Sequence, residues 1–95
     1  ALPLLAGTLD YARMGIIPAA TYQNRTSIED LVHLKPTLPL ELSDILFDPQ
    51  TSGGLLFSLP EKEGQQLLRE LNASIPVAKI IGHVEAFHDW SIFVK

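Results

Sequence analysis

The residues best suited to chemistry lie in the segment Asp48–Leu56, which reads Asp-Pro-Gln-Thr-Ser-Gly-Gly-Leu-Leu. The hydroxyls of Thr51 and Ser52 donate and accept hydrogen bonds, and Gly53 and Gly54 permit backbone angles and close approaches that a Cβ forbids. Consecutive backbone N–H groups in such a turn form an anion-binding nest. The segment therefore predicts either a phosphate-facing turn or a purely structural turn that launches a strand.

The segment Asp48–Leu56 is not a Walker A loop. It lacks the Gly-Lys-Ser/Thr ending, and the apolar residues that follow predict a strand, so no helix dipole is aimed at a phosphate. Asp48 precedes Pro49, and an aspartate in that position is either an available acid or a hydrogen-bond acceptor for its own turn.

A second, weaker candidate is the pair Asn24 and Arg25, because a guanidinium offers a fixed cationic fork to an anion. The other polar clusters predict no catalytic residue and no metal site. The adjacent carboxylates Glu29 and Asp30 point in different directions on a helix, and the five-residue spacing of His83 and His88 across a predicted turn does not converge ligands.

The first half of the chain predicts helices around an irregular segment. An apolar stripe at a spacing of three and four residues predicts a first helix, which Gly15 ends. Pro18 favours a loop or irregular segment over residues 16–26. A short strand is expected at 31–34, and a short helix at 40–47 with Leu42, Ile45 and Leu46 on its buried side.

The second half predicts strands around one helix. Strands are expected at 55–59, 77–84 and 91–94, and Pro60 starts a helix whose apolar face is Leu67, Leu68 and Leu71. This order predicts an α+β fold with helices packed on a mainly antiparallel sheet.

Composition narrows the class of protein. The 95 residues are expected to form a single domain, and a content of 46% hydrophobic and 19% charged residues indicates a globular protein. The net charge of −4 argues against nucleic-acid binding. The absence of Cys excludes disulfides and thiol catalysis within it. No apolar stretch approaches ~18 residues and no secretory pattern is present, which predicts no membrane contact and a cytoplasmic setting.

The Asp48–Leu56 segment resembles the signature of the carboxy-terminal domain of the selenophosphate synthetase (selenide, water dikinase) family. Residues 15–25 resemble the family's Gly-x-x-Pro-Gly-Gly-Thr-x-x-Asn segment, with Ala19 and Ala20 where glycines are usual. Residues 78–84 resemble its closing strand, apolar-Ile-Gly-x-Val. The likeness covers nearly the whole chain and favours this family over others in the aminoimidazole ribonucleotide synthetase-like superfamily.

The resemblance implies a partial carboxy-terminal domain over residues 1–95, incomplete at its amino-terminal end. The parent enzyme would convert ATP, selenide and water to selenophosphate, AMP and phosphate with Mg²⁺, and its catalytic Cys or selenocysteine and Lys would lie upstream. The chain alone would be inactive, bind no cofactor, pack on the amino-terminal ATP-binding domain and belong to a homodimer. Its phosphate-facing candidates are Thr51, Ser52, Gly53, Gly54, Asp48, Asn24 and Arg25. The alternative is a non-catalytic binding or oligomerisation module of the same fold.

Overall fold

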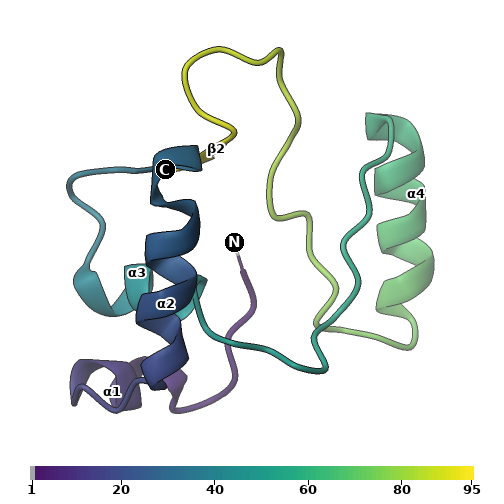
Figure 1. Ribbon diagram of the computed structural model, residues 1–95. Coiled ribbons are helices and arrows are strands. Elements are labelled where there is room, and N and C mark those ends of the chain that lie inside the picture. Colours follow the sequence, from purple (N-terminus) through teal and green to yellow (C-terminus); the bar gives the residue numbers. More distant parts are fainter. Residues whose placement is uncertain (1) are drawn as a thin grey trace. The chain divides into compact units, whose positions relative to one another are not determined.

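The computed structural model describes residues 2–95, and the chain divides into two compact units (Figure 1). The larger unit comprises residues 5–52 and 86–95, and the smaller comprises residues 2–4 and 53–85. The boundary in the middle of the chain falls between Ser52 and Gly53, inside the segment that the sequence singles out. The structure is of the α+β class, as predicted.

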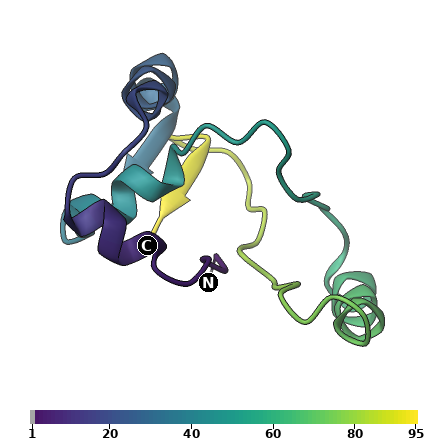
Figure 2. The same cartoon turned by 90° about the horizontal axis from the view of Figure 1, so that it is seen from below.

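The larger unit contains helices and both strands. Its elements are α1 (Thr8–Arg13), α2 (Ala19–Ile28), the 3-10 helix η1 (Glu29–Leu31), β1 (Val32–Leu34), α3 (Leu40–Leu46) and β2 (Ile92–Val94). The two strands lie side by side (Figure 2), and Val32 is opposite Ile92 while Leu34 is opposite Val94. Both strands, and the helix at 40–46, match the sequence-based expectations.

The prediction of a mainly antiparallel sheet does not hold for the strands in residues 2–95, because β1 and β2 run parallel. The strands predicted at 55–59 and 77–84 are also not observed as strands; both segments lack ladder hydrogen bonds, and Val77 lies in a turn. Strand propensity alone does not make a strand, since each one requires a neighbouring backbone that completes its ladder.

Proline sets the start of α2, α3 and α4. Pro18, Pro39 and Pro60 each occupy the position before the first helical residue, with φ between −59° and −54° and an extended ψ. The carbonyl of each accepts a backbone hydrogen bond from the first turn of its helix. Proline fits there because the N–H that it lacks would have no partner in the helix.

This role of Pro18 corrects the expectation of an irregular segment at 16–26. Pro18 is a helix start rather than a breaker, and Ala19 and Ala20, which replace the glycines usual in the family segment, are strong helix formers. The first predicted helix is shorter than its apolar stripe, because Gly7 at φ 83° delays its start to Thr8. Gly15, at φ 74°, ends it as expected.

The interior of the larger unit is unusually polar. Ala12 and Phe47 are its buried apolar side chains, whereas Thr21, Ser43 and Asp44 are buried polar ones, and Thr21 is only 1% exposed. The sequence placed Leu42, Ile45 and Leu46 on the buried side of α3, but these are half-buried and Ser43 and Asp44 lie deeper. Polar contacts therefore hold α2 against α3.

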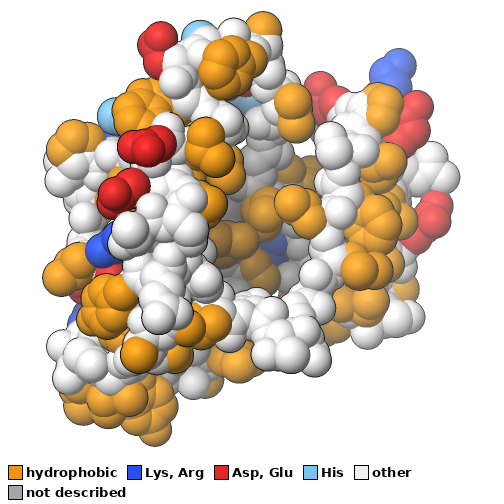
Figure 3. Space-filling model, viewed as in Figure 1, with side chains coloured by type: hydrophobic (Ala, Val, Ile, Leu, Met, Phe, Trp, Pro, Cys, Tyr) orange, Lys and Arg blue, Asp and Glu red, His pale blue; other side chains and the backbone are white. Residues whose placement is uncertain are grey.

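The smaller unit contains α4 (Glu61–Asn72), which confirms the helix predicted after Pro60, and the two extended segments on either side of it. Its apolar side chains remain accessible: Leu55 is 86% exposed and Val84 is 84% exposed. Figure 3 shows hydrophobic side chains on the surface of this unit. Within residues 2–95, no helix combines the length and apolar character that a membrane span requires.

We expect this exposed apolar surface to make the 95-residue chain self-associate, because contiguous apolar patches and unpaired extended backbone favour intermolecular contacts. Light scattering should give an apparent mass above the monomer that rises with concentration. The double change Leu55→Ser/Val84→Thr should lower that mass, whereas Leu5→Gln, at an equally exposed site outside the two segments, should not. A strict monomer at high concentration would contradict the prediction.

Candidate functional site

The signature segment Asp48–Leu56 begins directly after α3. Phe47 ends that helix with φ −103° and ψ 13°, and the Asp48 N–H donates to the Ile45 carbonyl at 3.2 Å. Residues 51–52 form a turn, and every residue from 49 to 56 is exposed. Asp48 is half-buried, and its carboxylate accepts a hydrogen bond from the Gln50 amide at 3.3 Å. Asp48 thus supports its own turn, as the structural interpretation of that residue predicts.

The hydroxyls of Thr51 and Ser52 do not stabilise the turn in which they lie. Neither makes a hydrogen bond to any residue in the described range 2–95, and both residues are exposed. A turn held together by its own side chains would use these hydroxyls internally. They are therefore available to a ligand.

Gly54 is not required by the conformation of the chain. Its φ lies outside the left-handed region, which within residues 2–95 is occupied by Gly7 and Gly15. A Cβ built at Gly54 would meet no atom within 4 Å. Neither backbone strain nor packing within the described residues explains the glycine.

The second-tier candidates, Asn24 and Arg25, project from α2 toward α3. The Asn24 amide donates to the Phe47 carbonyl at 3.0 Å. The Arg25 guanidinium lies 3.2 Å from the Asp44 carboxylate, contacts the Ser43 hydroxyl, and places its Cζ 5.2 Å from the centre of the Phe47 ring. The structure does not bring this pair together with Thr51 and Ser52 through any hydrogen bond.

Asp44 and Thr21 are the polar residues that sequence reasoning missed. The Asp44 side chain is 8% exposed and faces Arg25, and Thr21 lies one helical turn before Arg25 on α2. The Thr21 hydroxyl and the Arg25 Nε are buried without a hydrogen-bond partner. The available signal was the spacing of Thr21 and Arg25 by four residues, which places both on one face once a helix is assigned there.

The other titratable residues do not gather into a metal site. His83 contacts the Glu85 carboxylate at 2.5 Å, and His88 packs on the ring of Phe93 at 4.8 Å. Within residues 2–95 there is no group of three or more His, Asp or Glu side chains placed to hold a metal ion.

Similarity to known proteins covers almost the entire chain. It is 46% identical over 94 residues to a selenide, water dikinase of Clostridium botulinum (strain Alaska E43 / Type E3), a match that covers 99% of this chain and 27% of that protein. It is 38% identical to selenide, water dikinases of Caldanaerobacter subterraneus and Agathobacter rectalis, over 99% of this chain and 27% and 28% of theirs.

No family model and no solved structure matches the chain. The chain spans about a quarter of the length of the curated relatives that it matches. The aligned region covers 99% of the residues and therefore includes the signature segment, α2 and α4. By sequence, therefore, the chain is similar along almost its whole length to one segment of proteins named selenide, water dikinase (selenophosphate synthetase).

Proposed function

We propose that this chain is the carboxy-terminal segment of an enzyme that makes selenophosphate from ATP, selenide and water, releasing AMP and phosphate. The observation that carries the proposal is the similarity over 99% of the chain to proteins named selenide, water dikinase. The chain contributes one wall of the active-site cleft and lacks the nucleophile and the metal ligands. Those groups lie in the part of the parent protein outside this chain.

The signature segment is the part of the chain that faces phosphate. Its support is the pair of exposed hydroxyls, Thr51 and Ser52, that make no hydrogen bond within residues 2–95. Hydroxyl donors fixed beside a transferring phosphoryl group stabilise the negative charge on its oxygens. Gly53 and Gly54 allow the phosphate to approach the backbone, and Asp48 holds the start of the turn through Gln50.

ATP is the phosphoryl donor in the parent, and Mg²⁺ is bound with it by residues upstream. The described residues offer no carboxylate cluster for that ion, so no step of the reaction is assigned to a metal ligand of this chain. The amino-terminal ATP-binding domain of the same polypeptide is the partner against which this segment packs, and the parent is a cytoplasmic homodimer.

The fold of the parent domain follows the aminoimidazole ribonucleotide synthetase-like arrangement, with the extended segments 55–59 and 77–84 as strands. The support for this arrangement is the exposure of their apolar side chains. Leu55, Leu56 and Val84 are each at least 79% exposed, so no other residue of the smaller unit packs over them. Pairing with strands contributed by the remainder of the protein removes that apolar surface from water.

The test is selenide-dependent AMP formation by the full-length protein that contains this chain. We expect turnover that requires both ATP and selenide, whereas the isolated 95-residue chain should show none above a heat-inactivated sample, because the described residues hold no metal cluster and the sequence holds no Cys. A folded full-length protein without turnover would favour a non-catalytic module. Turnover by the isolated chain would place the catalytic groups within it and contradict the assignment.

A further inference from the structure

Helices α2 and α3 meet through a mainly polar cluster that ends at Phe47, the residue directly before the signature segment. We call it the α2–α3 cluster, and its members are Thr21, Asn24, Arg25, Ser43, Asp44 and Phe47. Thr21, Asn24 and Arg25 share one face of α2, because residues three and four apart on a helix are neighbours. Thr21 is the sole buried residue of α2, so this polar face is the one that packs.

Asn24 binds the backbone at the point where the signature segment leaves α3. The carbonyl that accepts its hydrogen bond, at 3.0 Å, belongs to the peptide bond between Phe47 and Asp48. Carbonyls in the last turn of a helix have no partner in the helix itself, so a side chain from elsewhere must satisfy them when they are removed from water. Pro49 follows Asp48 and restricts the backbone angles of that residue. The direction in which the chain leaves Phe47 is therefore maintained into the turn.

Arg25 fixes the same end of α3 from the side. Its guanidinium contacts the Asp44 carboxylate and the Ser43 hydroxyl, and its Cζ lies over the Phe47 ring. The side chain of Arg25 is 26% exposed and that of Asp44 is 8% exposed, so the carboxylate offsets the positive charge in a poorly hydrated setting. A phosphate would have to displace a buried partner to use this guanidinium.

We propose that Asn24 and Arg25, with Asp44, are positioning residues for the signature segment rather than ligands of phosphate. They hold the exit from α3 in the orientation that presents Thr51 and Ser52 to the substrate. This inference rests on the proposed function of the segment, and it changes the role of Asn24 and Arg25 from that suggested by their residue types alone.

The discriminating change is Asp44→Asn in the full-length protein, because it keeps the shape of the side chain and removes the charge that holds Arg25. If Arg25 positions the segment, kcat should fall at least tenfold while the KM for ATP changes less than threefold. If Arg25 binds phosphate, releasing it from Asp44 should leave kcat intact and lower the KM for ATP, and that result would overturn the proposal. Activity is measured well below the melting temperature of each variant, so that loss of folded protein does not contribute.

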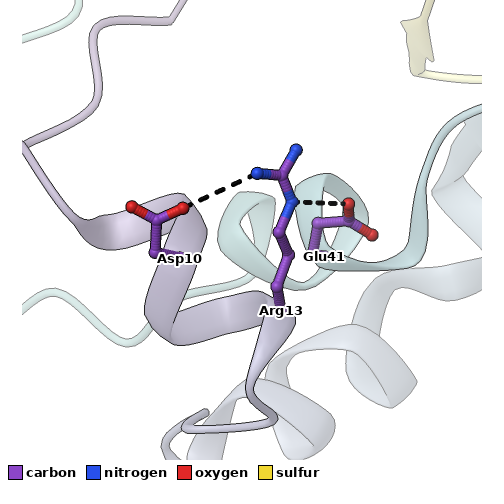
Figure 4. A network of polar contacts seen from close by, with 3 residues as sticks. All are labelled: Asp10, Arg13 and Glu41. Atoms are coloured by element: carbon purple, nitrogen blue, oxygen red, sulfur yellow. Dashed lines mark hydrogen bonds and ion pairs between the residues drawn. The ribbon is translucent and has the colours of Figure 1, made fainter.

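The matched control is Glu41→Gln, the same acid-to-amide type of change on the same helix. Glu41 accepts from Arg13 Nε of α1 at 3.4 Å, and Arg13 also lies 3.6 Å from Asp10 (Figure 4). This ion pair joins α3 to a different helix and does not touch Phe47. Glu41→Gln should therefore change kcat less than twofold; an effect equal to that of Asp44→Asn would assign both to general destabilisation of α3 and overturn the positioning role.

A second measurement does not depend on turnover. The backbone N–H groups of Phe47 and Asp48 donate to Asp44 and Ile45 at 3.1 and 3.2 Å, so their hydrogen exchange reports the integrity of the last turn of α3. Asn24→Ala should speed exchange at these two amides at least tenfold while leaving Met14 and Gly15 of the α1 end unchanged. Unchanged exchange at Phe47 and Asp48 would overturn the inference even if the parent makes no selenophosphate, which separates its failure from failure of the proposed function.

Discussion

The double change Thr51→Ala/Ser52→Ala in the full-length protein should reduce the rate of selenophosphate formation by about 10- to 100-fold while leaving the melting temperature within a degree or two of the wild type. The two hydroxyls are exposed and make no hydrogen bond within residues 2–95, so their removal leaves no buried partner unsatisfied. A hydrogen bond to a charged group contributes about 1.5–3 kcal/mol, and each ~1.4 kcal/mol corresponds to a tenfold change in rate, so the expected range corresponds to the loss of one such hydrogen bond.

The matched control for this experiment is Ser58→Ala, which removes another exposed hydroxyl that makes no hydrogen bond within residues 2–95 but lies beyond the diglycine. It should leave both rate and melting temperature unchanged. The structural interpretation of the turn makes the opposite prediction for Thr51 and Ser52: the melting temperature falls by several degrees and activity declines only with the folded fraction. Wild-type activity in the double variant would end the phosphate-contact hypothesis.

The sequence predicted those elements whose signals are local. Pro60 before a run of helix formers located α4, and the short β-rich runs at 31–34 and 91–94 located β1 and β2. The pairing of β1 with β2 joins residues about sixty positions apart, and no local pattern encodes its parallel direction. The segments 55–59 and 77–84 have the composition of strands, but no backbone among the described residues pairs with them.

The candidate site was predicted in part for the same reason. A motif placed Thr51 and Ser52 in a turn after the helix at 40–47, and the structure shows a turn there, in which both residues are exposed. Asn24 and Arg25 were assigned a charge-based role because residue type reveals that a guanidinium can bind an anion but not that Asp44 already faces it. The misassignment of α2 as irregular had a direct consequence: without a helix at Ala19–Ile28, the shared face of Thr21 and Arg25 could not be recognised.

A substitution at Gly54 should affect catalysis without weakening the fold. Gly54→Ala should leave the melting temperature of the full-length protein unchanged or slightly higher, because its φ is not left-handed and the new Cβ meets no described atom within 4 Å. Replacing glycine by alanine at a compatible position stabilises by about 0.4–1 kcal/mol through the unfolded state. If phosphate approaches this backbone, the same methyl group should lower the rate at least tenfold, measured as selenide-dependent AMP formation.

The control is Gly64→Ala in α4, where the added Cβ would lie 4.0 Å from the Leu59 Cβ, an ordinary contact. Alanine in place of glycine inside a helix stabilises by up to about 1 kcal/mol, so Gly64→Ala should raise the melting temperature without changing the rate. Neither variant should then lower the melting temperature, but only Gly54→Ala should lower the rate of selenide-dependent AMP formation. A Gly54→Ala enzyme as active as Gly64→Ala would show that no substrate group approaches Gly54, and the diglycine would have to be explained by the passage of the chain between its two units, whose boundary lies immediately before Gly53.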